Sequence, residues 1–398
     1  MKRLGPILAL AALGLLAACA SRPSVSDLAT RSDAQAYGDF MVARYAAMTN
    51  DPSAASRYYA QAMSSAPSEM AVPERAVFSA LLANDYGLAA GLSRRASNAG
   101  STAGLVRLTQ IVDLIGRGKN TQALETISGS GFSGFNQMLG HNLSAWARVG
   151  LKDYEGARAE LAGNLTGEPR LDSATFHMKG FIEMSAGDDE AALATFTALW
   201  NSGARLAVGA EAYAQLLAAS GKRAEAADVL VRFRTEAGFN AALEALKADI
   251  ESGKEIQPKR YTARQGAALV LHLPAAALIG QTSGDVSAVY FVLAIALDPD
   301  LYSARTLLGQ ALIQGGRNDE AIRVLKGVPA SSPYYASARG QLARLLLDAD
   351  RPDEALRLAG EAIAAKPERG LKIQLATLYS SLDRYSEAEE ILTGIIAD

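Results

Sequence analysis

Residues 284–367 read GDVSAVYFVLAIALDPDLYSARTLLGQALIQGGRNDEAIRVLKGVPASSPYYASARGQLARLLLDADRPDEALRLAGEAIAAKP, and this stretch decides the fold. Three prolines within it, Pro299, Pro333 and Pro367, stand 34 residues apart. The phrase Asp-Glu-Ala ends at Ala321 and again at Ala355, also 34 residues apart. A fixed period of this length is the signature of a solenoid of stacked supersecondary units. The sequence therefore predicts a repeat array.

The same signal can be followed towards the N-terminus. In each unit a short turn containing Gly, Asn, Asp or Lys leads, a few residues later, to a small residue in an apolar helical pattern. We expect two antiparallel helices joined by that turn, with the small residue where the helices approach most closely. Six earlier small residues stand 34 or 35 residues apart: Ala55, Ala89, Ala123, Ala157, Ala192 and Ala226.

These positions resemble the tetratricopeptide repeat (TPR) motif. One unit matches it at Leu308-Gly309, Ala321, Leu325 and Pro333, and another matches at Lys179-Gly180, Ala192 and Phe196. The tryptophan of the family's first helix is mostly absent, and Leu often replaces the larger aromatic residue. The resemblance implies an all-α, right-handed superhelical solenoid of antiparallel helix pairs, a TPR array of about nine to ten units.

The phase of the repeat breaks once. We therefore expect an N-terminal array over residues 36–236, an irregular helical connector over 237–283 and a C-terminal array over 284–398. Within the connector, residues 262–280 are apolar almost throughout, but Arg264, His272 and Pro274 favour a packed helix over a membrane span. The last helix stops short of the expected proline, so we expect the final unit to be incomplete.

The N-terminus has the pattern of a targeting segment. Lys2 and Arg3 precede an apolar run that ends in Leu16-Ala17-Ala18-Cys19, which predicts a signal peptide over residues 1–18. The polar residues that follow predict a flexible tether, so that residues 19–35 comprise Cys19 and this tether. Cys19 is the only cysteine of the chain, which excludes a disulfide within it.

The last four residues of that segment resemble the bacterial lipobox. The resemblance implies that Cys19 is lipidated, and Ala20, which stands where inner-membrane lipoproteins carry Asp, implies an outer-membrane protein that faces the periplasm. The alternative is a plain secretory signal with an incidental cysteine. The phrases at 296–300 (ALDPD) and 328–335 (VPASSPYY) are similar to a group of alphaproteobacterial TPR proteins. This resemblance implies no activity.

Sequence signals for catalysis are missing. No nucleotide-binding, hydrolase or metalloprotease motif is present, and His141, His177 and His272 have no ligand spacing. The acids at 188–190 and 319–320 recur at the phase of the repeat, so we interpret them as helix-start acids. A net charge of −3 gives no basic field for nucleic acid. We expect no enzyme activity, no catalytic residue, no metal and no cofactor.

The resemblance also implies where a partner binds. The first helices of the units line the inner groove of a TPR superhelix, where peptides and partner helices lie. The positions carried over are Asn142, Trp146, His177, Phe181, Glu211, Gln215, Thr306, Gln310, Ile313, Gln314, Arg344 and Asp348. Each of them is alternatively an ordinary solvated position. The glycine-rich residues 128–135 are a connector or, alternatively, a lid over a ligand.

The sequence thus predicts a membrane-anchored periplasmic scaffold that binds other envelope proteins or peptides. One alternative is a regulator of peptidoglycan enzymes, and another is a lipoprotein that binds a glycan or small ligand. We expect neither nucleic acid nor a small-molecule substrate as partner.

The lipid anchor gives a first test. Replacing Cys19 with Ser removes the thiol that carries the acyl chain, so the protein should move from the outer-membrane fraction to the soluble periplasmic fraction. Immunoblots of the separated fractions measure this. Unchanged sedimentation of Cys19→Ser with the outer membrane would contradict the anchor.

Overall fold

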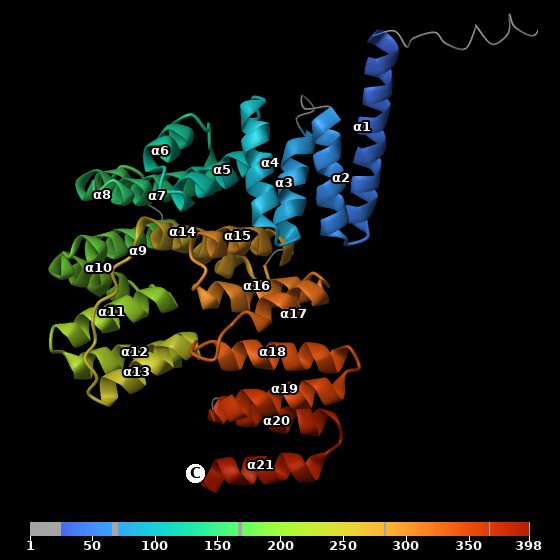
Figure 1. Cartoon of the computed structure of the whole chain (residues 1–398). Coiled ribbons are helices and arrows are strands. Elements are labelled where there is room, and N and C mark those ends of the chain that lie inside the picture. The colour runs from blue at the N-terminus through green and yellow to red at the C-terminus, as the bar shows by residue number, and fades with distance from the viewer. Residues whose placement is uncertain (1–24, 66–70, 166–168, 282–283, 366, 398) are drawn as a thin grey trace, which may run out of the picture.

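The computed structural model describes residues 25–65, 71–165, 169–281, 284–365 and 367–397, and over these ranges the chain forms α-helices and no strand (Figure 1). The predicted all-α solenoid of antiparallel helix pairs is confirmed. The signal peptide, Cys19 and residues 20–24 lie outside the described residues.

The first array consists of six antiparallel helix pairs, in which each odd-numbered helix is the first of its pair. Its helices are α1 (Val25–Met48), α2 (Pro52–Ser65), α3 (Ala71–Leu82), α4 (Tyr86–Asn98), α5 (Gly104–Gly116), α6 (Asn120–Ser128), α7 (Gly134–Gly150), α8 (Tyr154–Ala162), α9 (Pro169–Ala186), α10 (Asp189–Asn201), α11 (Ala207–Ala219) and α12 (Arg223–Ala237).

One turn geometry recurs between the two helices of a pair. Five residues before each small alanine, the chain adopts a left-handed conformation with φ between 55° and 85°. Gly, Asn and Asp tolerate this region better than other residues, which explains their recurrence in the turns. The left-handed residues are Asn50, Asn84, Gly118, Lys152, Gly187, Gly221, Gly316, Asp350 and Asp383. The alanines that follow them are at most 3% exposed, which confirms the phase of the repeat.

Aspartates begin several of the second helices. The carboxylates of Asp85, Asp153 and Asp188 each accept a hydrogen bond from the backbone N–H three residues later, at the first turn of α4, α8 and α10. Such a cap satisfies a donor that the helix itself leaves free. The interpretation of Asp188 as a helix-start acid is therefore confirmed.

The chain then leaves the period. Helix α13 (Ala241–Glu251) packs on α12 and α11, and an irregular segment leads from it to α14 (Ala263–Leu278). Thr262 and Gln265 form a capping box that begins α14. Helix α14 pairs with α15 (Gly284–Leu297), and together they begin the second array, which continues through α16 (Tyr302–Gln314), α17 (Asn318–Lys326), α18 (Tyr335–Asp348), α19 (Pro352–Ala365), α20 (Arg369–Ser381) and α21 (Tyr385–Ala397).

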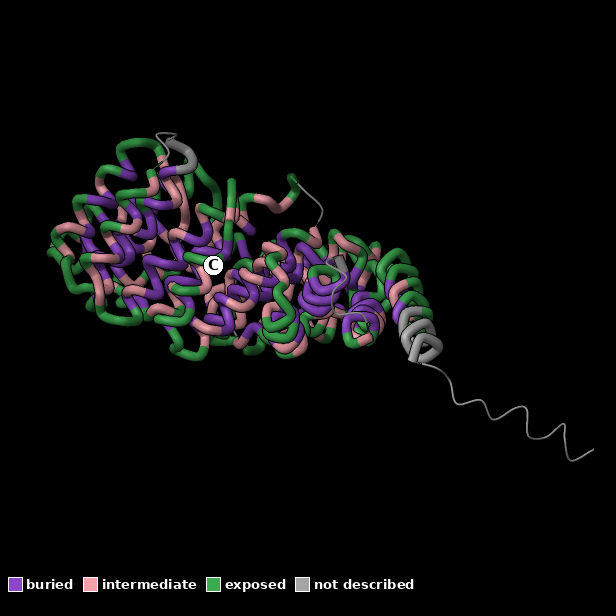
Figure 2. Tube along the Cα trace, turned by 90° about the horizontal axis from the view of Figure 1, so that it is seen from above, coloured by how far each residue is buried: buried purple, intermediate pink, exposed green. Residues whose placement is uncertain are grey.

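The first pair of the second array lies in the concave face of the first array. Helix α14 packs against α5, α7 and α9, and α15 packs against α3, α4 and α5 (Figure 1). Side chains from both arrays therefore share one hydrophobic core. Figure 2 shows buried residues throughout the interior of the stacked helices and exposed residues mainly along the outline.

The closest approach in this core joins Gly266 of α14 to Trp146 of α7. The Trp146 side chain is fully buried, and a Cβ atom added at Gly266 would lie 2.1 Å from its indole ring. Trp146 fills the space that any larger residue at 266 would need. Glycine is therefore required here for packing and not for a special φ.

A buried arginine joins the two arrays at a second place. Arg317, between α16 and α17, is 3% exposed and donates hydrogen bonds to the Leu82 carbonyl (2.7 Å) and the Asp285 carboxylate (2.8 Å). Beside it, Asn50 donates to the Gly315 carbonyl over 2.9 Å. These bonds connect the start of α15 and the α16–α17 turn to the end of α3 and the α1–α2 turn.

Part of the predicted tether is wrong. Helix α1 begins at Val25, so residues 25–35 of the segment assigned to a flexible tether are helical. Residues 25–35 contain neither Gly nor Pro, so nothing in their composition interrupts the helix. From Ala36 onward, α1 buries alanines against α2.

The apolar residues 262–280 form the buried helix α14, as the sequence predicted. Among the described residues, no helix combines the length and the apolarity that crossing a bilayer requires. The arginine and histidine of this stretch are accommodated within the protein: Arg264 donates to the Leu297 carbonyl, and His272 is buried beside Phe291.

The contact of Gly266 with Trp146 predicts a large effect from one methyl group. Gly266→Ala should destabilise the protein by about 1–3 kcal/mol, because the added Cβ overlaps a ring that has no room to move. Chemical denaturation measures the change.

Gly360 in α19 is the matched control, since a Cβ there meets no atom within 4 Å. Gly360→Ala should stabilise the protein by about 0.5–1 kcal/mol through helix propensity alone. Equal effects of the two substitutions would show that α14 does not pack on α7 as described.

Candidate functional site

Four of the predicted groove residues lie on the concave face of the first array but are covered. Asn142, Trp146, His177 and Phe181 are each at most 4% exposed. The chain covers this face itself, with α14 and with the segment that precedes it. In this structure the four residues are therefore not available to a partner.

The covering segment is the non-helical stretch of residues 254–262, which follows the turn at the end of α13. The Lys259 backbone N–H donates to Gln215 Oε1 (3.1 Å), and the Tyr261 backbone N–H donates to Ser185 Oγ (3.1 Å). The Tyr261 ring packs on Phe181, with 5.1 Å between the ring centroids. The first array thus holds part of its own chain through backbone hydrogen bonds and an aromatic anchor. These are the contacts that repeat grooves make with extended peptides.

An arginine fixes the same segment from the side. Arg260 directs its guanidinium at the Asp189 carboxylate, with 2.7 Å between Nη2 and Oδ2, and Nη1 also donates to the Met184 carbonyl. A fork on a carboxylate fixes position and orientation together. This pairing has no local sequence signal, because 71 residues separate the two side chains.

His177 and Asn142 have local partners. His177 Nδ1 lies 2.6 Å from the Ser173 carbonyl, and its ring packs where Gly209 of α11 has no side chain. Burial lowers the pKa of His177, and the hydrogen bond to Ser173 partly opposes that shift. Asn142 Nδ2 donates to the Met138 carbonyl. Asn142 thus bonds within its own helix, and His177 packs between α9 and α11.

The second array has an open concave face with two adjoining pockets. The first, which we call the junction pocket, has a volume of about 430 Å³. It lies between α14, α16 and α18, and the beginnings of α11 and α13 also border it. The predicted residues Thr306 and Gln310 line it, together with Leu206, Ala207, Val208, Asn240, His272, Leu273, Ala276, Ala277, Ser303, Leu307, Tyr334, Ser337 and Gln341. Its lining is uncharged and combines apolar side chains with hydroxyls and amides.

The second pocket, the α18–α20 pocket, has a volume of about 400 Å³. It contains the predicted pair Arg344 and Asp348, with Gly340, Ala343, Leu347, Gln374, Thr377, Leu378 and Ser381. Both charged side chains are exposed. The structure thus brings together four of the predicted residues of the second array. The other two, half-buried Ile313 and exposed Gln314, line neither pocket.

Several buried polar atoms around these pockets have no hydrogen-bond partner within the described structure. They are His272 Nδ1, Gln341 Oε1 and Gln374 Oε1. An unpaired buried polar atom costs about 1–3 kcal/mol, so an amide that can turn towards a ligand gains from doing so. The concave face of the second array therefore offers hydrogen-bonding capacity that the fold itself does not use.

Glu211 lies at the edge between the two arrays. Burial raises the pKa of its carboxyl, and Lys259 partly opposes the shift. Burial also raises the pKa of the nearby Tyr334 phenol to about 12, with Glu211 adding to the shift and hydrogen bonds with Asn240 and Ser303 opposing it. Glu211 and Gln215 therefore face the connector and the junction between the arrays.

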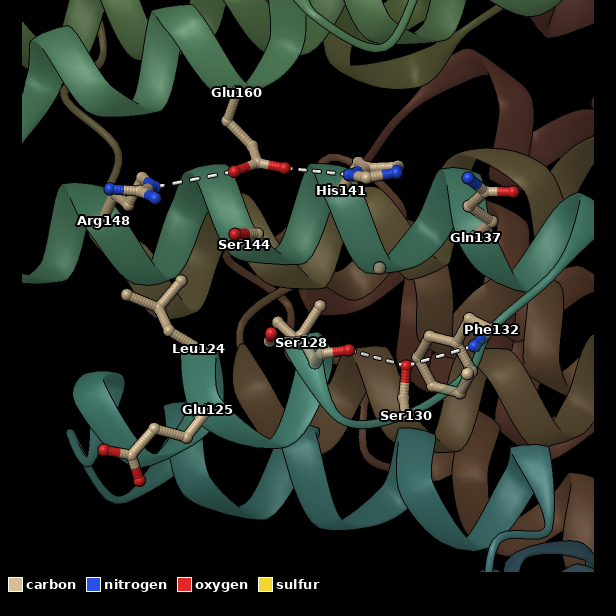
Figure 3. A pocket seen from close by; sticks show the side chains of 13 residues that line it. Leu124, Glu125, Ser128, Ser130, Phe132, Gln137, His141, Ser144, Arg148 and Glu160 are labelled. Carbon is tan, nitrogen blue, oxygen red and sulfur yellow. Dashed lines mark hydrogen bonds and ion pairs between the residues drawn. The ribbon is translucent and has the colours of Figure 1, made fainter.

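A third pocket lies outside the concave faces. The sequence did not predict that its charged residues would come together. The pocket has a volume of about 630 Å³ between α6, α7 and α8 (Figure 3). In it, Glu160 Oε1 lies 2.8 Å from His141 Nδ1, and Glu160 Oε2 lies 3.7 Å from Arg148 Nε. Ser128, Ser130, Gly131 and Phe132 form its rim, so the glycine-rich loop borders a pocket. The carboxylate is already paired within the protein.

No group of three or more His, Cys, Asp or Glu side chains that could hold a metal ion occurs among the described residues.

The comparisons with known proteins add no family. No family model and no curated protein matches the sequence. Among solved structures, the TPR domain of P58(IPK) matches at 13% identity and a TM-score of 0.25, over 90% of this chain and 98% of that chain. The APC/C hetero-tetramer Cut9–Hcn1 matches at 12% identity and a TM-score of 0.32, over 98% of this chain and 89% of that one. Naa15/Naa10 bound to HypK-THB matches at 13% identity and a TM-score of 0.33, over 90% and 62%. The fold assignment rests on the helix pairs and turns of this chain.

His272 at the junction pocket predicts a pH dependence of stability. Burial lowers its pKa to about 4, below the ordinary value of about 6.5. Between these values the unfolded chain binds a proton that the folded chain does not, so stability is lost as the pH falls from about 6.5 towards 4, by up to about 3 kcal/mol.

His272→Gln should flatten this slope, measured as unfolding free energies in urea across that pH range. The neighbouring Leu273→Ala should lower stability at every pH and leave the slope unchanged. A slope that His272→Gln does not change would contradict burial of a neutral imidazole.

Proposed function

We propose that this chain is a membrane-anchored periplasmic scaffold that binds an extended segment of a partner protein on the concave face of its second array. The observation that carries the proposal is the difference between the two faces. The first array's groove is filled by the chain's own connector and α14, whereas the second array's face leaves two adjoining pockets open.

The chemistry of the open face suits a polypeptide. The buried amide oxygens of Gln341 and Gln374 have no partner within the described residues, and backbone N–H groups of an extended chain are suitable donors. The uncharged junction pocket accommodates an apolar side chain beside hydroxyls and amides. Exposed Arg344 and Asp348 at the α18–α20 pocket would add charge selection, which affects association rate and specificity more than total affinity.

The contacts of the first array support the same mode of binding. There the chain holds residues 259–261 by two backbone hydrogen bonds and one aromatic ring. A structure of the same helix-pair type thus already holds an extended segment within this molecule. The partner's segment would make similar contacts with helices α16, α18 and α20.

The lipobox-like segment at Cys19 supports the membrane anchor and the periplasmic location as parts of this proposal. Envelope proteins are then the class of partner within reach. Regulation of a peptidoglycan enzyme is a special case, in which the bound partner is that enzyme.

A photo-crosslinking amino acid placed at Arg344 in the full chain tests the proposal in cells. It should form an adduct with a partner protein, whereas the same amino acid at Arg357, exposed on α19 and outside both pockets, should not. Mass spectrometry identifies the captured protein as an assembly protein or a cell-wall enzyme. Adducts from Arg357 alone, or no adduct from Arg344 while purified protein binds glycan saturably, would overturn it.

The captured partner also allows a binding measurement. Arg344→Glu should weaken binding about tenfold, because it places a second acid beside Asp348 and reverses the charge that the partner meets. Arg357→Glu should leave the affinity unchanged. Calorimetry or fluorescence anisotropy with the purified partner distinguishes the two.

A further inference from the structure

The outward face of α1 carries a row of large apolar side chains. They recur every three or four residues and therefore lie along one side of the helix. Their exposed fractions are 67% for Tyr37, 45% for Met41, 69% for Tyr45 and 79% for Met48. We call these four residues the α1 stripe. Single exposed apolar residues are normal, but a row over several turns marks an interaction surface.

The opposite side of the same helix is already used. Ala36, Ala43 and Ala46 are buried against α2, and Arg75 of α3 lies 5.5 Å above the Phe40 ring. Figure 1 places α1 as the outermost helix at one edge of the molecule, and Figure 2 shows its surface as mainly exposed. The stripe therefore faces away from the rest of the described chain.

The sequence places the anchor close to this stripe. Val25, the first residue of α1, follows Cys19 by six positions along the chain. At a maximum of about 3.3–3.6 Å per residue, they span about 20 Å when fully extended. An acyl chain on Cys19 would thus hold the beginning of α1 within that distance of the bilayer surface. Tyr37 follows Val25 by twelve residues, about 18 Å of helix, so an α1 helix that lies along the bilayer meets lipid with its stripe at high effective concentration.

The composition of the stripe suits the interface of a membrane. Tyrosine places its ring among the acyl chains while its hydroxyl stays in water, and methionine is flexible and apolar. Arg44 follows Met41 by three residues and precedes Met48 by four, so it lies on the same side as the stripe and is exposed. An arginine beside an apolar row is typical of helices that lie in the plane of anionic membranes.

A second copy of the chain is a poorer occupant. Four side chains on one helix cover less than the roughly 800 Å² that each partner contributes to a standard interface. A bilayer needs no shape complementarity and has no such threshold.

We propose that the α1 stripe lies on the lipid surface in which Cys19 is anchored, so that α1 is an interfacial helix that sets the orientation of the solenoid. This inference rests on the anchor in the proposed function. Figure 1 shows helices α18–α21 of the second array at the opposite end of the molecule from the beginning of α1.

The single cysteine of the chain makes the test direct. Once Cys19 is acylated, an introduced cysteine is the only free thiol. A polarity-sensitive fluorophore on Met41→Cys should emit at shorter wavelength when the lipidated protein is reconstituted in vesicles of phosphatidylethanolamine and phosphatidylglycerol. Lipids with brominated acyl chains should quench it. Val231→Cys on α12 is the matched control, because Val231 is equally exposed (46%) and also apolar. Its fluorophore should remain in water.

Each outcome of this experiment either supports or overturns the lipid contact of the α1 stripe. If, on vesicle-bound protein, the fluorophore at residue 41 emits at the same wavelength as the one at residue 231 and is not quenched by brominated lipids, the proposal is overturned. Shielding at residue 41 that appears without vesicles and rises with protein concentration also overturns it, since a second copy would then cover the stripe. The mass of the N-terminal peptide reports acylation separately. If Cys19 is not acylated, the anchor in the proposed function is wrong. The stripe is then tested with the Cys19→Ser, Met41→Cys double variant and an excess of vesicles. A blue shift of the fluorophore emission supports a lipid-binding stripe, and an unchanged emission overturns it.

Discussion

The crossing of α14 over α7, with Gly266 against the ring of Trp146, is the contact on which the arrangement of the two arrays depends. Because no Cβ separates them, α14 enters the concave face of the first array deeply enough to share its core. Close packing makes this position intolerant of volume. The placement of α15 and then of α16–α21 follows from it, since each pair of a solenoid packs on the pair before it. Arg317 adds a second attachment, in which Nη2 pairs with the Asp285 carboxylate and Nη1 donates to the Leu82 carbonyl.

The concave faces of the two arrays differ, because the chain covers the face of the first array and leaves that of the second array open. A groove lined by aromatic rings and small residues would be a large apolar surface if it were open, and such surfaces promote association. Here the connector and α14 cover it, with backbone hydrogen bonds to Gln215 and Ser185. The second array leaves its two pockets open, and exposed Arg344 and Asp348 lie at one of them. The proposed binding surface therefore lies in the C-terminal half of the chain.

The proposed roles assign lipid contact and partner binding to different surfaces of the molecule. The apolar stripe of α1 lies at one edge, next to the residues that lead to Cys19, and the pockets of the second array lie between α14 and α20. The first array connects them as a rigid body whose core continues into α14 and α15. A scaffold of this shape holds a bound segment at a defined height and orientation relative to the lipid surface, which a flexible tether alone would not do.

The sequence by itself determined the helix pairs, their period and their turns. Left-handed Asn, Asp and Gly residues and small alanines such as Ala321 act within one unit, so their signal is local and repeats. The resemblance to TPR proteins also placed Thr306, Gln310, Arg344 and Asp348 on groove-facing helices, and in the structure the first two line the junction pocket and the last two the α18–α20 pocket. Only the tertiary structure decided that the other groove is filled. That outcome depends on pairs such as Gly266 with Trp146, 120 residues apart, whose contact is set by shape and not by period.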